Sequence, residues 1–109
     1  MAIKSFGVAR ILKEVLGDIE GIEEAFIYGS FAKGEVDAKS DIDLFVIGDI
    51  DYNALSKAAR TAKDVLGREV NFDLFSEKEF FEKQKEGNPP IKDITSDKRI
   101  ELIKNGQRI

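Results

Sequence analysis

Two aspartates one residue apart, Asp41 and Asp43, stand at the head of an apolar run in this sequence. A Gly29-Ser30 pair precedes them, with ten residues in between. Paired carboxylates bind divalent metal ions. A Gly-Ser turn that opens a helix presents free backbone N–H groups to anions such as phosphates. Together these residue types suit chemistry on a phosphate group.

The spacing of the two carboxylates is weak support by itself. The chain has ten aspartates in 109 residues, so roughly one pair at this spacing is expected by chance. A second pair, Asp49 and Asp51, occupies a predicted strand-to-helix turn, where aspartate is an ordinary helix cap. Asp41 and Asp43 instead adjoin a buried strand, where a charge needs a partner or a metal ion. The first pair is therefore the candidate site.

A third aspartate, Asp73, lies among apolar neighbours on a later predicted strand. A lone aspartate on an edge strand is usually solvated. Three aspartates on two strands of one small sheet can instead converge, and such a cluster repels itself without cations. Two Mg²⁺ ions about 3.5 to 4 Å apart are the usual arrangement for in-line phosphoryl-type displacement.

Gly29 and Ser30 have an ordinary interpretation as a strand-ending turn with a helix N-cap. The functional interpretation requires the glycine to let backbone approach a phosphate and the serine to offer its hydroxyl and N–H groups. Lys33, one turn further on, adds positive charge against a triphosphate, although an exposed helix lysine is more often plain surface.

Hydrophobic periodicity predicts the elements that position these residues. In chain order they are a helix over 3–19 ending near Gly17 or Gly21, a strand over 25–28, a short helix over 31–33 capped by Ser30 and ended by Gly34, a loop over 35–40, a strand over 42–47, a helix over 51–66 stopped by Gly67, a strand over 69–75, and a helix after Ser76 that ends before Gly87. Ser76 and Glu79 form a capping box. Residues 99–104 are compatible with a fourth strand, and Asn105-Gly106 is a hairpin signal although only three residues follow it.

Strand alternation assigns faces to the side chains. On the strand over 42–47, Asp41, Asp43 and Phe45 share one face, while Ile42, Leu44 and Val46 share the other. On the strand over 69–75, Val70, Phe72 and Leu74 share one face, while Asn71, Asp73 and Phe75 share the other. A helix after each of the first three strands predicts an α/β or α+β sandwich. We expect an α+β fold in which a small mixed sheet carries the aspartates on one face and helices on the other.

Composition limits the remaining classes. The length predicts one domain over 1–109, and the composition, 42% hydrophobic and 35% charged, is that of a globular protein. A net charge of -4 argues against unaided nucleic-acid binding. The charged N-terminal segment matches neither a signal peptide nor a membrane span, so we expect a cytoplasmic protein. The absence of cysteine excludes disulfides, and the absence of histidine leaves a carboxylate, a lysine or metal-bound water as general base.

The combined motif resembles the minimal nucleotidyltransferases (MNT type) of the DNA polymerase beta superfamily. The resemblance covers residues 25–75 and consists of Gly29-Ser30, then Asp41-Ile42-Asp43 before an apolar strand, then Asp73. It implies the polymerase beta palm-like fold of that family. It also implies that all three aspartates ligate the two Mg²⁺ ions and act in catalysis. Asp73 helps to deprotonate the acceptor, and Gly29 and Ser30 bind the β and γ phosphates.

By the same resemblance, the activity is Mg²⁺-dependent transfer of a nucleoside monophosphate, expected to be AMP from ATP, to a hydroxyl of an acceptor. Small family members resemble antitoxins that silence a helical HEPN-type partner by adenylylation. We expect such a partner here, while a homo-oligomer stays open. Two alternatives also stay open: a catalytically inactive module that binds a nucleotide or the partner and acts by occlusion, and a purely structural domain with a solvated acidic surface. A kinase-type phosphate-binding loop is excluded because its motif does not occur.

Overall fold

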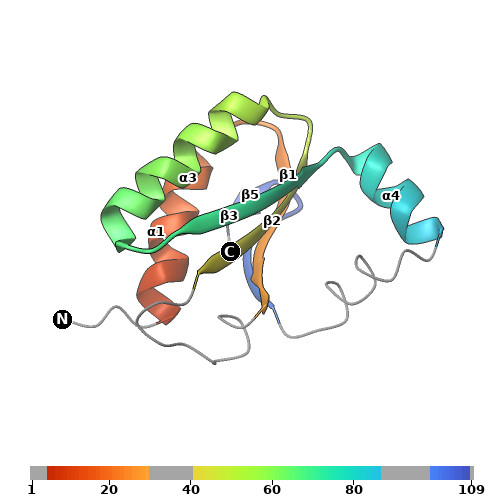
Figure 1. Cartoon of the computed structure of the whole chain (residues 1–109). Helices are drawn as coiled ribbons and strands as arrows, with labels where there is room; N and C mark the ends of the chain where they lie inside the picture. The colour runs from red at the N-terminus through yellow and green to blue at the C-terminus, as the bar shows by residue number, and fades with distance from the viewer. Residues whose placement is uncertain (1–4, 30–40, 87–98, 109) are drawn as a thin grey trace.

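The computed structural model describes residues 5–29, 41–86 and 99–108 (Figure 1). The helices and strands are, in chain order, α1 Ser5–Gly17, β1 Ile22–Tyr28, β2 Ile42–Gly48, α3 Tyr52–Leu66, β3 Val70–Phe75, α4 Glu77–Lys85, β4 Ile100–Lys104 and β5 Gln107–Arg108. The strands form one five-stranded sheet in the order β3-β2-β1-β4-β5. β2 and β3 are parallel and are joined through α3, whereas the other neighbouring strands are antiparallel. The sheet is therefore mixed, as predicted.

The main core lies between the sheet and the two longer helices. Figure 1 shows α1 and α3 side by side on one face of the sheet, and the two helices contact each other. Ile42, Leu44 and Val46 point into this core and are fully buried. Val70, Phe72 and Leu74 of β3 pack against the same core. Strand alternation therefore assigned the faces of β2 and β3 correctly, because each strand buries one apolar set against helices.

The opposite face of the sheet carries an aromatic cluster centred on Phe45. The buried members are Phe26, Phe45 and Ile47, and Tyr28, Phe75 and Phe80 pack against them. Phe45 stacks on Phe26 with ring centroids 5.1 Å apart and on Phe75 at 5.3 Å. Phe80 of α4 meets the Phe45 ring edge-on at 5.7 Å. The short helix α4 thus contacts the face that α1 and α3 do not cover.

Local capping signals act as the sequence predicts. Asp51 caps α3 by accepting a hydrogen bond from the Asn53 backbone N–H at 3.1 Å. Gly67 ends this helix in the left-handed conformation at φ 70°, which glycine adopts without steric cost. The capping box of Ser76 and Glu79 is present at the start of α4. The second aspartate pair therefore supplies an ordinary helix cap.

The ends of some helices and strands differ from the predicted ones. β1 begins at Ile22 rather than at 25, because Ile22 pairs with Gly48 and so extends the strand through a distant partner. α1 ends at Gly17, the earlier of the two glycines.

The hairpin signal is confirmed, since Asn105 and Gly106 both adopt positive φ and connect β4 to β5.

Several predicted features lie outside the described residues. These are the N-terminal start of the first helix over 1–4, the short helix over 31–33 with its Ser30 cap and its Gly34 end, the loop over 35–40 and the stop signal over 87–90. No helix within the described ranges is long and apolar enough to span a membrane.

Candidate active site

Three strands bring polar side chains together at one end of the sheet. Tyr28, the last residue of β1, pairs with Asp43 of β2, and Asp43 pairs with Asn71 of β3. Asp41 directly precedes β2, and Asp73 lies two residues beyond Asn71 on β3. Alternation places Asp43, Asn71 and Asp73 on the aromatic face of the sheet. The first expectation, that carboxylates from β2 and β3 share one face, is met.

Asp43 is the electrostatic centre of this group. Its side chain is half-buried, whereas Asp41 and Asp73 are exposed. Burial raises the pKa of Asp43, and the neighbouring negative charges of Asp41 and Asp73 raise it further. A hydrogen bond from Asn71 works in the opposite direction. Asp43 is therefore the carboxylate whose ionisation is opposed both by burial and by the charges of its neighbours.

Gly29 lies beside the Asp43 carboxylate, with little space for a side chain between them. Its φ is +77°, in the left-handed region. A Cβ at this position would lie 2.7 Å from Oδ2 of Asp43. The backbone conformation therefore favours glycine, and any larger residue would displace the Asp43 carboxylate oxygen. Its partners in the predicted phosphate-binding turn, Ser30 and Lys33, lie outside the described residues.

Asp73 is held by a residue that the sequence did not single out. The hydroxyl of Tyr28 donates a hydrogen bond to Oδ2 of Asp73 at 2.8 Å. The Tyr28 ring meets Phe45 edge-on, with centroids 6.2 Å apart. Burial, followed by this hydrogen bond and the nearby charge of Asp73, raises the pKa of Tyr28. The phenol therefore stays protonated and acts as a donor at neutral pH.

Asn71 is the second residue that sequence reasoning missed. Its side-chain amide donates to Oδ2 of Asp41 at 3.5 Å, and it also hydrogen-bonds Asp43. Its position on the predicted polar face of β3, two residues before Asp73, was the available signal. Asn71 lies beside Asp43 because of the register between β2 and β3. That register is a property of strand pairing and cannot be predicted from the sequence of β3 alone.

The donor set suits Mg²⁺ only if a nucleotide supplies further oxygens. Within the described ranges, no group of three or more acidic side chains lies close enough to hold a metal ion by itself. Mg²⁺ commonly binds through one or two carboxylates together with substrate phosphates. Asp41 and Asp43 provide two carboxylates, and the pKa of Asp43 is raised first by burial and then by the negative charges of Asp41 and Asp73. These residues therefore fit the predicted metal ion.

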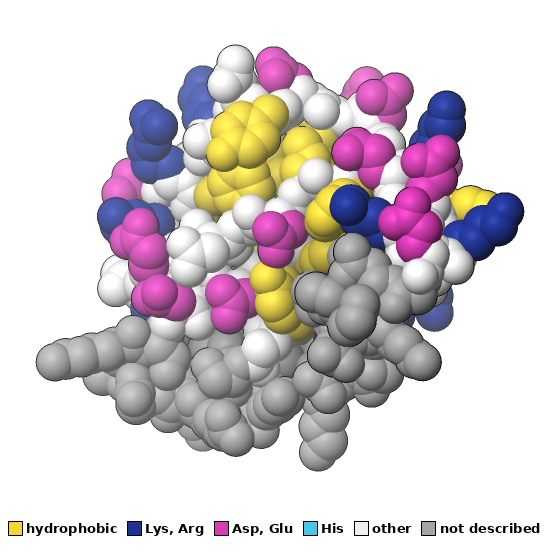
Figure 2. Space-filling view, turned by 45° about the vertical axis from the view of Figure 1, so that its right-hand side comes forward, with side chains coloured by type: hydrophobic (Ala, Val, Ile, Leu, Met, Phe, Trp, Pro, Cys, Tyr) yellow, Lys and Arg dark blue, Asp and Glu magenta, His cyan; other side chains and the backbone are white. Residues whose placement is uncertain are grey.

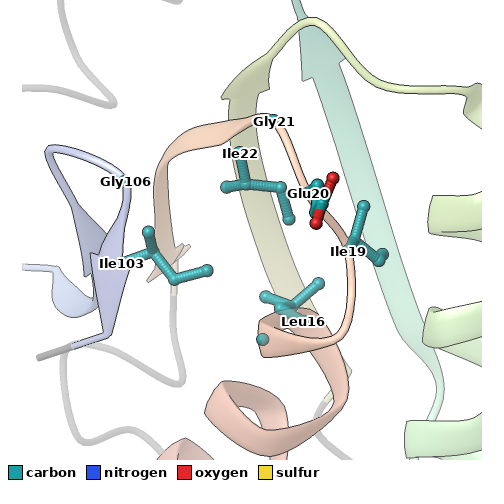
Figure 3. Close-up of a pocket in the computed structure, with 8 residues that line it drawn as sticks. Leu16, Ile19, Glu20, Gly21, Ile22, Ile103 and Gly106 are labelled. Carbon is teal, nitrogen blue, oxygen red and sulfur yellow. The ribbon is translucent and has the colours of Figure 1, made fainter.

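Two of the hollows that described residues line lie at the other end of the sheet, beside the Ile22 and Gly48 pair. One, of about 320 Å³, is lined by Leu16, Ile19 and Ile22 among others, and the hairpin residue Gly106 borders it (Figure 3). The other, of about 580 Å³, is lined by Gly21, Glu23, Asp49, Ser76, Glu77 and Lys78. Neither contains the candidate carboxylates. Figure 2 shows acidic side chains interspersed with apolar ones across one face, with basic side chains mostly toward its edges.

Comparison with known proteins bears on the family and the fold of the chain. The family model of the nucleotidyltransferase domain matches residues 9–102. No curated protein sequence matches the chain. One similar solved structure is a toxin-antitoxin crystal structure with AMP-PNP, with a TM-score of 0.62 and 19% identity over 88% of this chain and 73% of that one.

Two further solved structures are similar to this chain over a smaller share of their own length. One is a mutant of the toxin-antitoxin MntA-HpeT, with a TM-score of 0.50 and 21% identity over 62% of this chain and 55% of that one. The other is a tri-AMPylated HEPN toxin in complex with an MNT antitoxin from Shewanella oneidensis, with a TM-score of 0.49 and 21% identity over 68% and 56%. At these identities the likeness concerns the fold.

Proposed function

The chain belongs to the nucleotidyltransferase domain family, and from that premise we propose that it transfers AMP from ATP to a hydroxyl group of a protein partner. The observation that carries the proposal is Asp43. This half-buried carboxylate has Asp41 and Asp73 as charged neighbours, and a Cβ at Gly29 would lie 2.7 Å from its Oδ2. A structural surface aspartate needs none of these neighbours. A site for Mg²⁺ and a triphosphate uses all of them.

Each candidate residue has a separate proposed role, in metal binding, phosphate binding or orientation of the carboxylates. Asp41 and Asp43 would hold Mg²⁺, which neutralises phosphate charge and polarises the phosphoryl oxygens. Gly29 leaves room for backbone N–H groups to approach phosphates, with Ser30 and Lys33 as further phosphate contacts. Asn71 orients Asp41 and Asp43 through its amide.

The transfer itself is a single in-line displacement. The acceptor hydroxyl oxygen attacks the α-phosphorus of ATP, and the bond from that phosphorus to the bridging oxygen of pyrophosphate breaks. Asp73 takes the proton of the hydroxyl. Because the chain has no histidine, a carboxylate is the base available in this group of residues.

The acceptor is proposed to be the toxin of a toxin-antitoxin pair, of the HEPN type. Support comes from the likeness of the fold to a toxin-antitoxin structure solved with AMP-PNP and to the toxin-antitoxin MntA-HpeT. The chain would then act as the antitoxin and silence its partner by adenylylation. With ATP as the donor, the reaction belongs in the cytoplasm.

Transfer of labelled AMP tests the proposal. The chain is incubated with a HEPN-type partner, Mg²⁺ and ATP labelled at the α-phosphate or, separately, at the γ-phosphate. We expect the partner to acquire label from the α position alone, and the double variant Asp41→Asn, Asp43→Asn to abolish the transfer. The double variant Asp49→Asn, Asp51→Asn is the matched control, because it has the same spacing and asparagine also caps helices.

A partner that is silenced without label would contradict the proposal. If that silencing also persists in the Asp41→Asn, Asp43→Asn variant, the chain acts by occlusion, which is the alternative function.

A further inference from the structure

Asp73 differs from the other two candidate carboxylates in its setting. It lies on β3, which is the end strand of the described sheet, and its side chain is exposed. Exposed side chains on an edge strand sample several rotamers, and a carboxylate that accepts a proton during catalysis must be held in one. Something must therefore fix Asp73.

The hydroxyl of Tyr28 is placed to do so. It spans from β1 across β2 and donates to Oδ2 of Asp73 at 2.8 Å. Two features hold the tyrosine in turn. Its backbone is paired with Asp43 in the interior of the sheet, and its ring packs edge-on against Phe45, which is fully buried. The donor is thus anchored in the core although its acceptor is not.

We propose that Tyr28 is a positioning residue: its hydroxyl fixes Oδ2 of Asp73 and so turns Oδ1 toward the reacting group. The inference rests on the proposed function, since it assigns Asp73 a role in the same site. A single bond from a fixed donor leaves one carboxylate oxygen free and sets the plane of the group. Partners of this kind, which orient a ligand or a base without contacting substrate, typically contribute about 10-fold to 100-fold to metal affinity or activity.

Packing alone does not explain a tyrosine at this position. The edge-on contact with Phe45 is made by the ring, and phenylalanine would make the same contact. Among the described residues, what the hydroxyl adds is the hydrogen bond to Asp73. The substitution Tyr28→Phe therefore removes the proposed function of the residue and preserves its packing.

A double-mutant cycle separates positioning from structure. The variants are Tyr28→Phe, Asp73→Asn and the two combined. Tyr52→Phe is the matched control, because Tyr52 packs against Phe72 and is 62% exposed. Four quantities are measured for each: AMP-PNP affinity by isothermal titration calorimetry, Mn²⁺ binding in the presence of AMP-PNP by electron paramagnetic resonance, and kcat and KM for ATP in the AMP-transfer assay.

We expect Tyr28→Phe to leave AMP-PNP affinity and KM for ATP unchanged, while Mn²⁺ affinity or kcat falls by about 10-fold or more. Tyr52→Phe should change none of these. In the Asp73→Asn background, Tyr28→Phe should have no further effect, because its role is exercised through Asp73.

Three results would overturn the inference. If Tyr28→Phe matches wild type in both Mn²⁺ binding and kcat, or if its effect persists undiminished in the Asp73→Asn background, positioning is refuted and the proposed function stays intact. A wild-type chain that binds neither Mn²⁺ nor AMP-PNP refutes the proposed function, and the positioning role falls with it.

Discussion

Gly29 offers the sharpest single perturbation, because the structure contains a glycine that controls for backbone strain. Gly29 and Gly67 both adopt left-handed φ, at +77° and +70°. Replacement of either by alanine should cost about 1 to 2 kcal/mol for the backbone conformation alone. A Cβ at Gly67 would have no neighbour within 4 Å, whereas a Cβ at Gly29 would lie 2.7 Å from Oδ2 of Asp43. The two variants therefore share their backbone strain and differ in the effect on the carboxylate.

The contact sets the size of the expected effect. Ordinary van der Waals contact for a Cβ begins at 3.4 Å, so the Asp43 carboxylate must move by about 0.7 Å. Because it terminates a side chain, it can move with little additional loss of stability. A misplacement near 1 Å in a catalytic site costs on the order of 100-fold in rate. We expect Gly29→Ala to weaken Mg²⁺ and AMP-PNP binding, and AMP transfer, by about 10-fold to 100-fold.

Thermal unfolding with and without Mg²⁺ and AMP-PNP measures both quantities. Without ligand, Gly29→Ala and Gly67→Ala should lower Tm by similar amounts, about 4 to 8 °C for each kcal/mol. With ligand, Gly67→Ala should recover the full stabilisation of wild type and Gly29→Ala should not. Equal ligand stabilisation in the two variants would refute the assignment of Gly29 to the site.

Three further predictions concern charge, packing and capping. Because its pKa is raised on folding, Asp43 favours folding below its unfolded pKa of about 3.9 and loses that contribution as pH rises through its folded pKa. Asp43→Asn should therefore raise the ligand-free stability at pH 7 and give no gain at pH 3, measured by urea unfolding, and a loss at pH 7 would contradict the raised pKa. Leu44→Ala empties a fully buried site and should cost about 2 to 5 kcal/mol in the same assay, and a loss under 1 kcal/mol would contradict the burial. Ser76→Ala removes the α4 cap and should cost about 1 kcal/mol, whereas no loss would mean the capping box is not formed in solution.

Local patterns predicted those features whose cause is local. Alternation identified which side chains of β2 and β3 face α1 and α3, because each strand packs against these helices on one side. The capping box at Ser76 and the hairpin at Asn105-Gly106 follow from backbone geometry within a few residues. The placement of Asp43 and Asp73 on one face follows from the same alternation.

Features that depend on strand pairing could not be predicted from the sequence. β1 starts at Ile22 because of its pairing with Gly48, which no local pattern encodes. The hydrogen bond from Tyr28 to Asp73 joins residues 45 positions apart across an intervening strand. The role of Asn71 likewise requires the register of β2 with β3. Residue type and spacing identify candidate ligands, and the sheet order determines which side chains support them.

The measurement that bears most directly on the central claim is a thermal-shift titration with ATP and Mg²⁺. At about 100 times Kd, a ligand adds roughly 2.7 kcal/mol, which for a domain of this size is a shift on the order of 10 °C. We predict a Mg²⁺-dependent shift that is lost in the Asp41→Asn, Asp43→Asn variant and kept in the Asp49→Asn, Asp51→Asn variant. A shift that survives in both variants, or no shift up to millimolar ATP, would contradict a nucleotide site at these carboxylates.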